Sequence, residues 1–246
     1  MDWGDSSADT VFTEAGPGSI TDKAHTYADD GTYTVTITVE EENGTGPGSD
    51  QETFEVTVAN VLTRAGYACG MVGKWDSGRA RRFLPTSRGF EFFYGFANTG
   101  IDYWTHERYG IPSLLRGTER IEESGYATDL FGREALRFVR EHRDRPFFLY
   151  LAYNAPHAAS NLERDSYQVP AETLSRFYPE ADPQDKRTKY RAMVSHMDAS
   201  IGELLAVLEE LQLTEQTLVL FMSDNGGSGP ADNGPLRGHK GQMFEG

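Results

Sequence analysis

Four short clusters hold the polar residues of this sequence whose chemistry could be combined in one site. They contain Lys74, His157, Asp224 with Asn225, and Lys240. Asp224 and Asn225 directly follow the apolar run Thr217–Met222 and offer the hard oxygen ligands that divalent cations prefer. The two lysines could hold an anionic group, and the histidine could give a proton to a departing alcohol. These residue types together suit the binding of an oxyanion ester.

The clusters follow segments that are predicted to be buried strands. Tyr67–Trp75, Phe147–Tyr153 and Thr217–Met222 are short apolar runs, while Thr128–His142 and Lys186–Leu213 carry apolar residues at helical spacing. Such alternation predicts a parallel α/β sheet, in which the strand ends converge on one crevice. A plain turn would also use the sequence Asp-Asn-Gly-Gly, so the residues alone leave that alternative open.

Charge divides the chain near residue 60. Residues 1–60 contain 13 Asp/Glu and 1 Lys, a net of −12, and residues 61–246 contain 25 acids and 22 bases, a net of −3, which together give −15. This break predicts two domains, 1–60 and 61–246. The acidic balance disfavours binding to nucleic acid, and no apolar run approaches the roughly 20 residues of a membrane span. The single Cys69 stands in an apolar run and is predicted to be a buried thiol.

The first of these domains has a β pattern. Thr32–Val39 and Phe54–Val58 alternate apolar and polar residues, as strands with one buried face do. Together with Asp2–Asp5, His25–Tyr27 and Asp30–Val35, these segments resemble the PKD-type, immunoglobulin-like repeat. The resemblance covers about residues 2–60 and begins inside the repeat. It implies a small N-terminal fragment of a β-sandwich.

The second domain resembles the type I sulfatase family of the alkaline-phosphatase superfamily over about residues 61–246. The resemblance implies a partial alkaline-phosphatase-like mixed sheet flanked by helices, and hydrolysis of sulfate esters at a calcium site. The motifs that carry it are Gly66–Trp75, Gly89–Gly95, Asp102-Tyr103, Gly125–Asp129, Ala155–His157, Ser223–Gly226 and Leu236–Lys240.

Carried over residue by residue, the resemblance implies a role for each cluster. Lys74 and Lys240 are expected to bind the sulfate, and His157 is expected to protonate the leaving group. The adjacent Asp224 and Asn225 are the expected calcium ligands. Asp76 stands where the family usually has histidine, so it receives no role.

Two family motifs have no counterpart in this sequence. They are an opening Asp-Asp pair of metal ligands and a Cys- or Ser-x-Pro-x-Arg motif, whose first residue matures to the formylglycine nucleophile. We therefore expect a sulfatase unit that is truncated at both ends and inactive on its own. Loss of the strands that precede Gly66 should also expose an apolar sheet face beside Tyr67–Val72.

Two other functions stay open at this point. The chain could be a non-catalytic extracellular adhesion or binding fragment that carries the PKD module. It could also act on phosphate or phosphonate esters, although Lys74 with Lys240 makes this less favoured. The resemblance implies a sulfated small molecule or glycan as substrate and a periplasmic or extracellular location, and the sequence gives no oligomeric state.

Overall fold

The computed structural model describes residues 35–38, 51–54, 58–163 and 165–243, and the chain divides into two units, Met1–Val61 and Leu62–Gly246. In the first unit, β1 (Val35–Thr38) pairs antiparallel with β2 (Gln51–Phe54). The other predicted parts of the β-sandwich fragment lie outside the described residues. The predicted strand Phe54–Val58 is wrong at its last residue, because Val58 begins helix α1 (Val58–Arg64). That these units are domains of different origin stays a prediction.

A five-stranded mixed sheet lies at the centre of the second unit, in the order β8-β7-β4-β3-β9. The central strand β3 (Ala68–Lys74) is parallel to both β4 (Phe92–Phe96) and β9 (Phe147–Ala152). Beyond β4, the short strands β7 (Leu115–Arg116) and β8 (Glu119–Arg120) continue the sheet antiparallel. The first two strands predicted from apolar runs, β3 and β9, are confirmed, with slightly shorter bounds.

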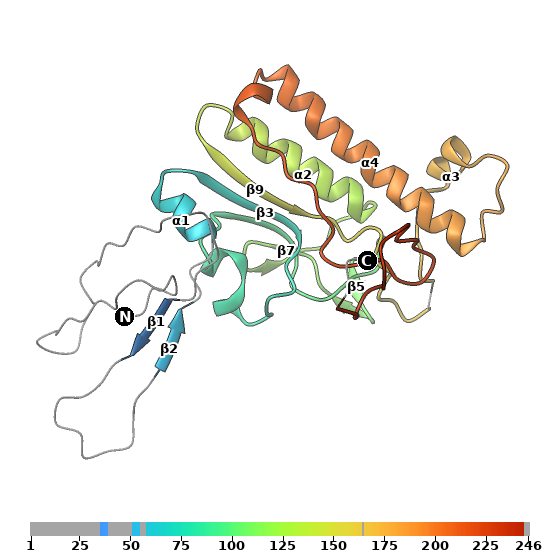
Figure 1. Ribbon diagram of the computed structural model, residues 1–246, viewed down its shortest axis with the longest axis horizontal. Coiled ribbons are helices and arrows are strands. Elements are labelled where there is room, and N and C mark those ends of the chain that lie inside the picture. Colours follow the sequence, from blue (N-terminus) through green and yellow to red (C-terminus); the bar gives the residue numbers. More distant parts are fainter. Residues whose placement is uncertain (1–34, 39–50, 55–57, 164, 244–246) are drawn as a thin grey trace, which may run out of the picture. The chain divides into compact units, whose positions relative to one another are not determined.

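Helices cover this sheet, which confirms the predicted α/β fold. Helix α2 (Ala127–Glu141) packs on β3, β4 and β9, and α4 (Lys186–Glu210) packs on α2. Figure 1 shows these two long helices side by side, with the shorter α3 (Ala171–Phe177) near the start of α4. The side chain of Asp185 accepts a 2.7 Å hydrogen bond from Thr188 N, so α4 begins with a satisfied N-cap.

The core joins the sheet to both long helices. The ring of Phe131 on α2 lies 6.1 Å from those of Tyr94 and Phe96 on β4, and Met193 of α4 is fully buried in the same cluster. The exposed apolar face expected beside Tyr67–Val72 stays a prediction: the neighbouring edge strand β9 is only partly buried, with Tyr150 46% exposed, although β3 itself is covered. Strand β3 is paired on both edges and packed against α2, and its side chains from Ala68 to Val72 are buried.

Thr217–Met222, the third apolar run, is not the buried strand that its sequence predicts. The segment has no strand pairing among the described residues, and its large side chains are exposed, from 54% for Val219 to 83% for Leu218. An apolar run becomes a strand only where a neighbour satisfies its backbone N–H and C=O groups. The described part of this chain provides no such neighbour.

The remaining elements are short. One is a hairpin between β5 (Glu107–Arg108) and β6 (Ile111–Pro112), and the others are 3-10 turns at Arg81–Phe83, Pro85–Ser87 and Thr214–Gln216. Within the described part of the chain, the helices are too short or too polar to cross a bilayer.

Candidate functional site

Lys74 lies at the carboxyl end of β3, where the chain leaves the sheet. The preceding Gly73 has φ 104°, and a Cβ at this position would lie 1.9 Å from the carbonyl oxygen of Ala152 on β9. Glycine is therefore required for the close approach of the two strands. The Nζ of Lys74 lies 3.7 Å from Oδ2 of Asp76 and 3.9 Å from Oδ2 of Asp224. The lysine thus lies near two carboxylates that are far apart in the sequence.

His157 follows β9 in the turn that begins with the buried Asn154. The backbone N–H of His157 donates to the Asn154 carbonyl at 2.8 Å, and the hydroxyl of Tyr103 donates to the His157 carbonyl at 2.8 Å. Its Nδ1 lies 2.7 Å from the carbonyl oxygen of Ala158. A carbonyl can only accept, so Nδ1 carries the proton and Nε2 is the nitrogen that can exchange one.

Burial and nearby charges both act on the pKa of His157. Burial lowers the pKa of this imidazole below its ordinary value, and the cations Lys74 and Lys240 lower it further, while the Ala158 carbonyl and Asp224 oppose the shift. The two lysines and the Asp224 carboxylate thus act on the ring through their charges. The ring is therefore neutral at neutral pH.

The loop after Met222 brings Lys240 to this group. Asn233 holds the loop together, since its Oδ1 accepts from Gly227 N at 2.9 Å and its Nδ2 donates to the Gly238 carbonyl at 3.0 Å. The backbone N–H of Lys240 donates to the Gly227 carbonyl at 3.1 Å. Lys240 is thereby tied to the Asp-Asn-Gly-Gly turn through backbone contacts.

Lys74 and His157 follow the neighbouring parallel strands β3 and β9, as the convergence of strand ends predicts, whereas Asp224 and Lys240 are on the loop after Met222, which follows no strand. Asn225, next to Asp224, is exposed on the same loop. Sequence reasoning missed Asp76, whose carboxylate belongs to the group although no role was assigned to it. The signals for Asp76 in the sequence are its place two residues after Lys74 and the histidine that the family usually has at this position.

Comparison with known proteins decides the family. The Sulfatase family model matches residues 25–246. The chain belongs to the sulfatase family. This is a family of sulfuric ester hydrolases, so the expected family and reaction class are confirmed. The match begins within the segment that resembles a PKD repeat, and that second resemblance stays a prediction.

Individual sulfatases show how much of the family's length is present. The chain is 32% identical over 221 residues to the uncharacterized sulfatase YdeN of Escherichia coli (78% of this chain, 37% of that protein). It is 33% identical over 212 residues to human N-acetylgalactosamine-6-sulfatase, a match that covers 78% of this chain and 38% of that protein. A crystal structure of Ps i-CgsB in complex with k-i-k-neocarrahexaose matches with a TM-score of 0.69 and 32% identity. This match covers 78% of this chain and 45% of that chain. The chain therefore spans less than half the length of these relatives.

Sulfatases generally depend on calcium, and the described residues of this sulfatase do not complete a calcium site. Calcium takes about 6–8 oxygen ligands. Residues 58–163 and 165–243 bring no three His, Cys, Asp or Glu side chains together as a metal-binding group. The Lys74 ammonium lies 3.7 Å from the Asp76 carboxylate and 3.9 Å from the Asp224 carboxylate. Asp224 and Asn225 would be two ligands of a larger set.

Cys69 is not a candidate nucleophile of this chain. Its side chain is fully buried in β3, where its Sγ lies 3.8 Å from the Tyr67 carbonyl. A nucleophile must reach substrate, and this thiol does not reach the surface.

Proposed function

We propose that the Leu62–Gly246 unit supplies the sulfate-binding side of a sulfate-ester hydrolase site. Lys74 and Lys240 bind the sulfate oxygens through their ammonium groups. His157 protonates the departing alcohol through Nε2. Asp224 and Asn225 contribute two oxygen ligands to calcium, and the remaining ligands come from outside the described residues.

One observation carries the proposal. Lys74 lies 3.9 Å from Asp224, and Lys240 is hydrogen-bonded to Gly227 of the same turn, so residues from separate parts of the chain meet at the end of β3. Both lysines lower the pKa of His157, which follows the neighbouring strand β9. Cations that disfavour the imidazolium would be neutralised by a bound sulfate dianion or sulfate ester. Anion binding is then expected to raise the pKa of His157, which makes the ring a better proton donor when substrate is present.

The proposal includes the inactivity of this chain on its own. The sequence contains no Cys- or Ser-x-Pro-x-Arg motif, and the buried Cys69 does not replace it. Loss of a covalent nucleophile removes most of an enzyme's rate enhancement, on the order of 10⁴–10⁶-fold. The substrate class we propose is a sulfated glycan, which agrees with the names of the relatives above.

The non-catalytic alternative concerns a different part of the chain. An adhesion or binding fragment with a PKD module would use residues 2–60. Within that segment the structure describes the β1–β2 pair and the start of α1. We do not adopt this alternative, because no observation in the described residues favours it.

Titration with inorganic sulfate tests the proposed binding site. We expect the ring signals of His157 to move in NMR spectra as sulfate is added, and its pKa to rise. Lys240→Ala should weaken the response, whereas Lys186→Ala, a change of an exposed lysine at the start of α4, should leave it intact. A His157 signal that is insensitive to sulfate would overturn the proposal.

An assay of aryl-sulfate hydrolysis tests the expected inactivity. Release of 4-nitrophenol from its sulfate ester, with calcium present, should stay at the background rate. Turnover that Lys240→Ala and Asp224→Ala abolish would show that the chain has a nucleophile we have not identified.

A further inference from the structure

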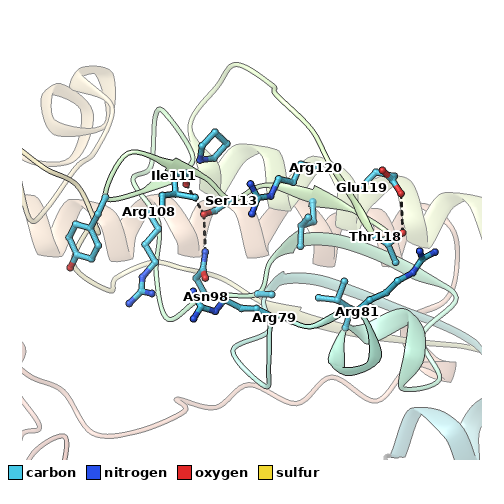
Figure 2. Close-up of a pocket in the computed structure, with 14 residues that line it drawn as sticks. Arg79, Arg81, Asn98, Arg108, Ile111, Ser113, Thr118, Glu119 and Arg120 are labelled. Atoms are coloured by element: carbon cyan, nitrogen blue, oxygen red, sulfur yellow. Dashed lines mark hydrogen bonds between the residues drawn. The ribbon is translucent and has the colours of Figure 1, made fainter.

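A hollow with four arginines in its lining lies near the proposed sulfate site. It is a cavity of about 350 Å³ at the ends of β3 and β4, bordered by the β5–β6 and β7–β8 hairpins. Figure 2 shows side chains from these separate segments around it. The polar residues that matter here are Arg79, Arg81, Asn98, Arg108, Ser113 and Arg120, and we call this hollow the arginine pocket.

The arginine pocket is positive in an acidic protein. Its lining holds four arginines and one acidic residue, Glu119, whereas the chain as a whole has a net charge of −15. Within residues 58–163 and 165–243, none of these four arginines is in a salt bridge. Among the same described residues, the Nε atom of Arg108 is buried and has no hydrogen-bond partner. Guanidinium groups that line a hollow and are not engaged in salt bridges are suited to an anion brought by a ligand.

The same pocket also has an apolar surface. Leu84 and Ala97 are buried in its lining, and Tyr109 and Ile111 expose 55% and 58% of their surface at the tip of the β5–β6 hairpin. Tyr109 is held there because its backbone N–H donates to the Ser160 carbonyl at 2.9 Å. An exposed aromatic ring beside cations fits the C–H face of a sugar that carries anionic groups.

One loop connects the arginine pocket to His157. Asn98 lines the pocket, where its Nδ2 donates to Ser113 Oγ at 2.8 Å. Two residues later, a Cβ on Gly100 would lie 3.1 Å from Nδ1 of His157. Two residues of chain span at most about 7 Å. Arg79 similarly follows Lys74 by a short loop, so the pocket and the sulfate site are neighbours.

We infer that the arginine pocket binds a second sulfate ester of the same oligosaccharide whose scissile sulfate lies at Lys74, Lys240 and His157. The substrate class is therefore a multiply sulfated glycan. This inference rests on the proposed function and adds to it a specificity site. Arg79 and Arg108 approach the second sulfate from opposite segments, and Tyr109 contacts the sugar ring that carries it.

Binding of matched sugars by the full chain tests the inference. The probes are a disulfated disaccharide, its monosulfated analogue and the unsulfated parent, measured by isothermal titration calorimetry. We expect the disulfated sugar to bind roughly tenfold more tightly than the monosulfated one, the size of one charge-assisted interaction. The double variant Arg79→Gln/Arg108→Gln should reduce that ratio to about one and leave the affinity for the monosulfated sugar unchanged.

Control variants separate this inference from the proposed function. Arg82→Gln removes one positive charge outside the lining and should keep the ratio, because Arg82 does not line the cavity. A ratio near one in the unmodified chain, or equal loss from Arg82→Gln, would overturn the second sulfate site. Lys240→Ala should weaken the binding of the disulfated and monosulfated sugars to the same extent. If it does not, the result contradicts the proposed function and not the second sulfate site. Circular dichroism checks folding, and Arg120→Gln replaces the double variant if that variant unfolds.

Discussion

The ammonium group of Lys74 lies 3.9 Å from the carboxylate of Asp224, although these residues come from opposite ends of the Leu62–Gly246 unit. Asp224 is 70% exposed at its side chain, so this pair by itself contributes little to stability, about 0–1 kcal/mol. Its importance is positional. The pair shows that the loop after Met222 reaches the end of β3 even though the segment before it is not a strand of the sheet.

Removing charges around His157 should move its pKa in opposite directions. Lys240→Ala removes a cation that disfavours the imidazolium, so the pKa of His157 should rise. Asp224→Asn removes an anion that favours it, so the pKa should fall further below its ordinary value. Titration of the His157 ring by NMR measures both changes.

The control for this pair of variants is Asp232→Asn. Asp232 is also exposed and lies 3.9 Å from Arg187, away from the charges that act on His157. Its replacement should leave the titration of His157 unchanged. Shifts of the same sign from Lys240→Ala and Asp224→Asn would show that the loop moves, and would contradict a direct charge effect.

The sequence predicted the placement of Lys74 and His157 after two paired strands. Lys74 and His157 come after β3 and β9, whose apolar runs are bounded by turn residues, so their meeting follows from parallel strand ends. The Thr217–Met222 prediction failed because periodicity and composition indicate only that a segment can be a strand. Whether it becomes one depends on a neighbour, which the pattern of the segment does not contain.

The arginine pocket lay beyond sequence reasoning for a related reason. Arg79 and Arg81 form a basic cluster that is visible in the sequence. Arg108 and Arg120 reach the same hollow only because two hairpins fold over the ends of the strands. Hairpins this short leave a weak pattern, so their spatial relation to Arg79 could not be predicted.

Gly73→Ala should destabilise the second unit strongly. The new Cβ would meet the Ala152 carbonyl at 1.9 Å, in a backbone conformation that L side chains rarely adopt. We expect a loss of about 3 kcal/mol or more in the free energy of unfolding. Urea denaturation measures it, with Gly66→Ala as the control, because Gly66 has φ 90° but nothing within 4 Å of the added Cβ. The control should lose only the conformational part, about 1–2 kcal/mol.

Loss of the charge of Glu134 on α2 should lower the stability of the protein more than loss of an exposed charge. It is 3% exposed and accepts hydrogen bonds from Arg116 at 2.9 and 3.0 Å and from Arg133 at 2.9 Å. Glu134→Gln should cost about 2 kcal/mol, less than for a wholly buried pair because both arginines are partly exposed. Glu210→Gln, which breaks the exposed pair with Arg140, should change the melting temperature little.

The contribution of Glu134 should also depend on pH. Burial opposes its ionisation, but the hydrogen bonds from Arg116 and Arg133 outweigh burial and hold its pKa below the ordinary value. Its stabilisation is therefore present above the pKa of an unfolded glutamate and is lost as pH falls through the folded value. The difference in unfolding free energy between the unmodified chain and Glu134→Gln should be full at pH 7 and smaller near pH 3. An equal difference at both pH values would contradict the ionised network.

The exposed apolar run Leu218–Met222 should favour aggregation and add little to the free energy of unfolding. Leu220 and Phe221 are 72% and 77% exposed, so replacing both by serine removes few packing contacts. We expect the double variant to change the free energy of unfolding by no more than about 0.5 kcal/mol, and to aggregate less because an exposed apolar run favours association. Phe131→Ala is the comparison variant, because removal of this fully buried ring should lower the free energy of unfolding by about 3–5 kcal/mol. Chemical denaturation and light scattering measure the two effects separately. A loss for Leu220→Ser/Phe221→Ser that approaches the loss for Phe131→Ala would show that the run is buried in solution, as the original strand prediction requires.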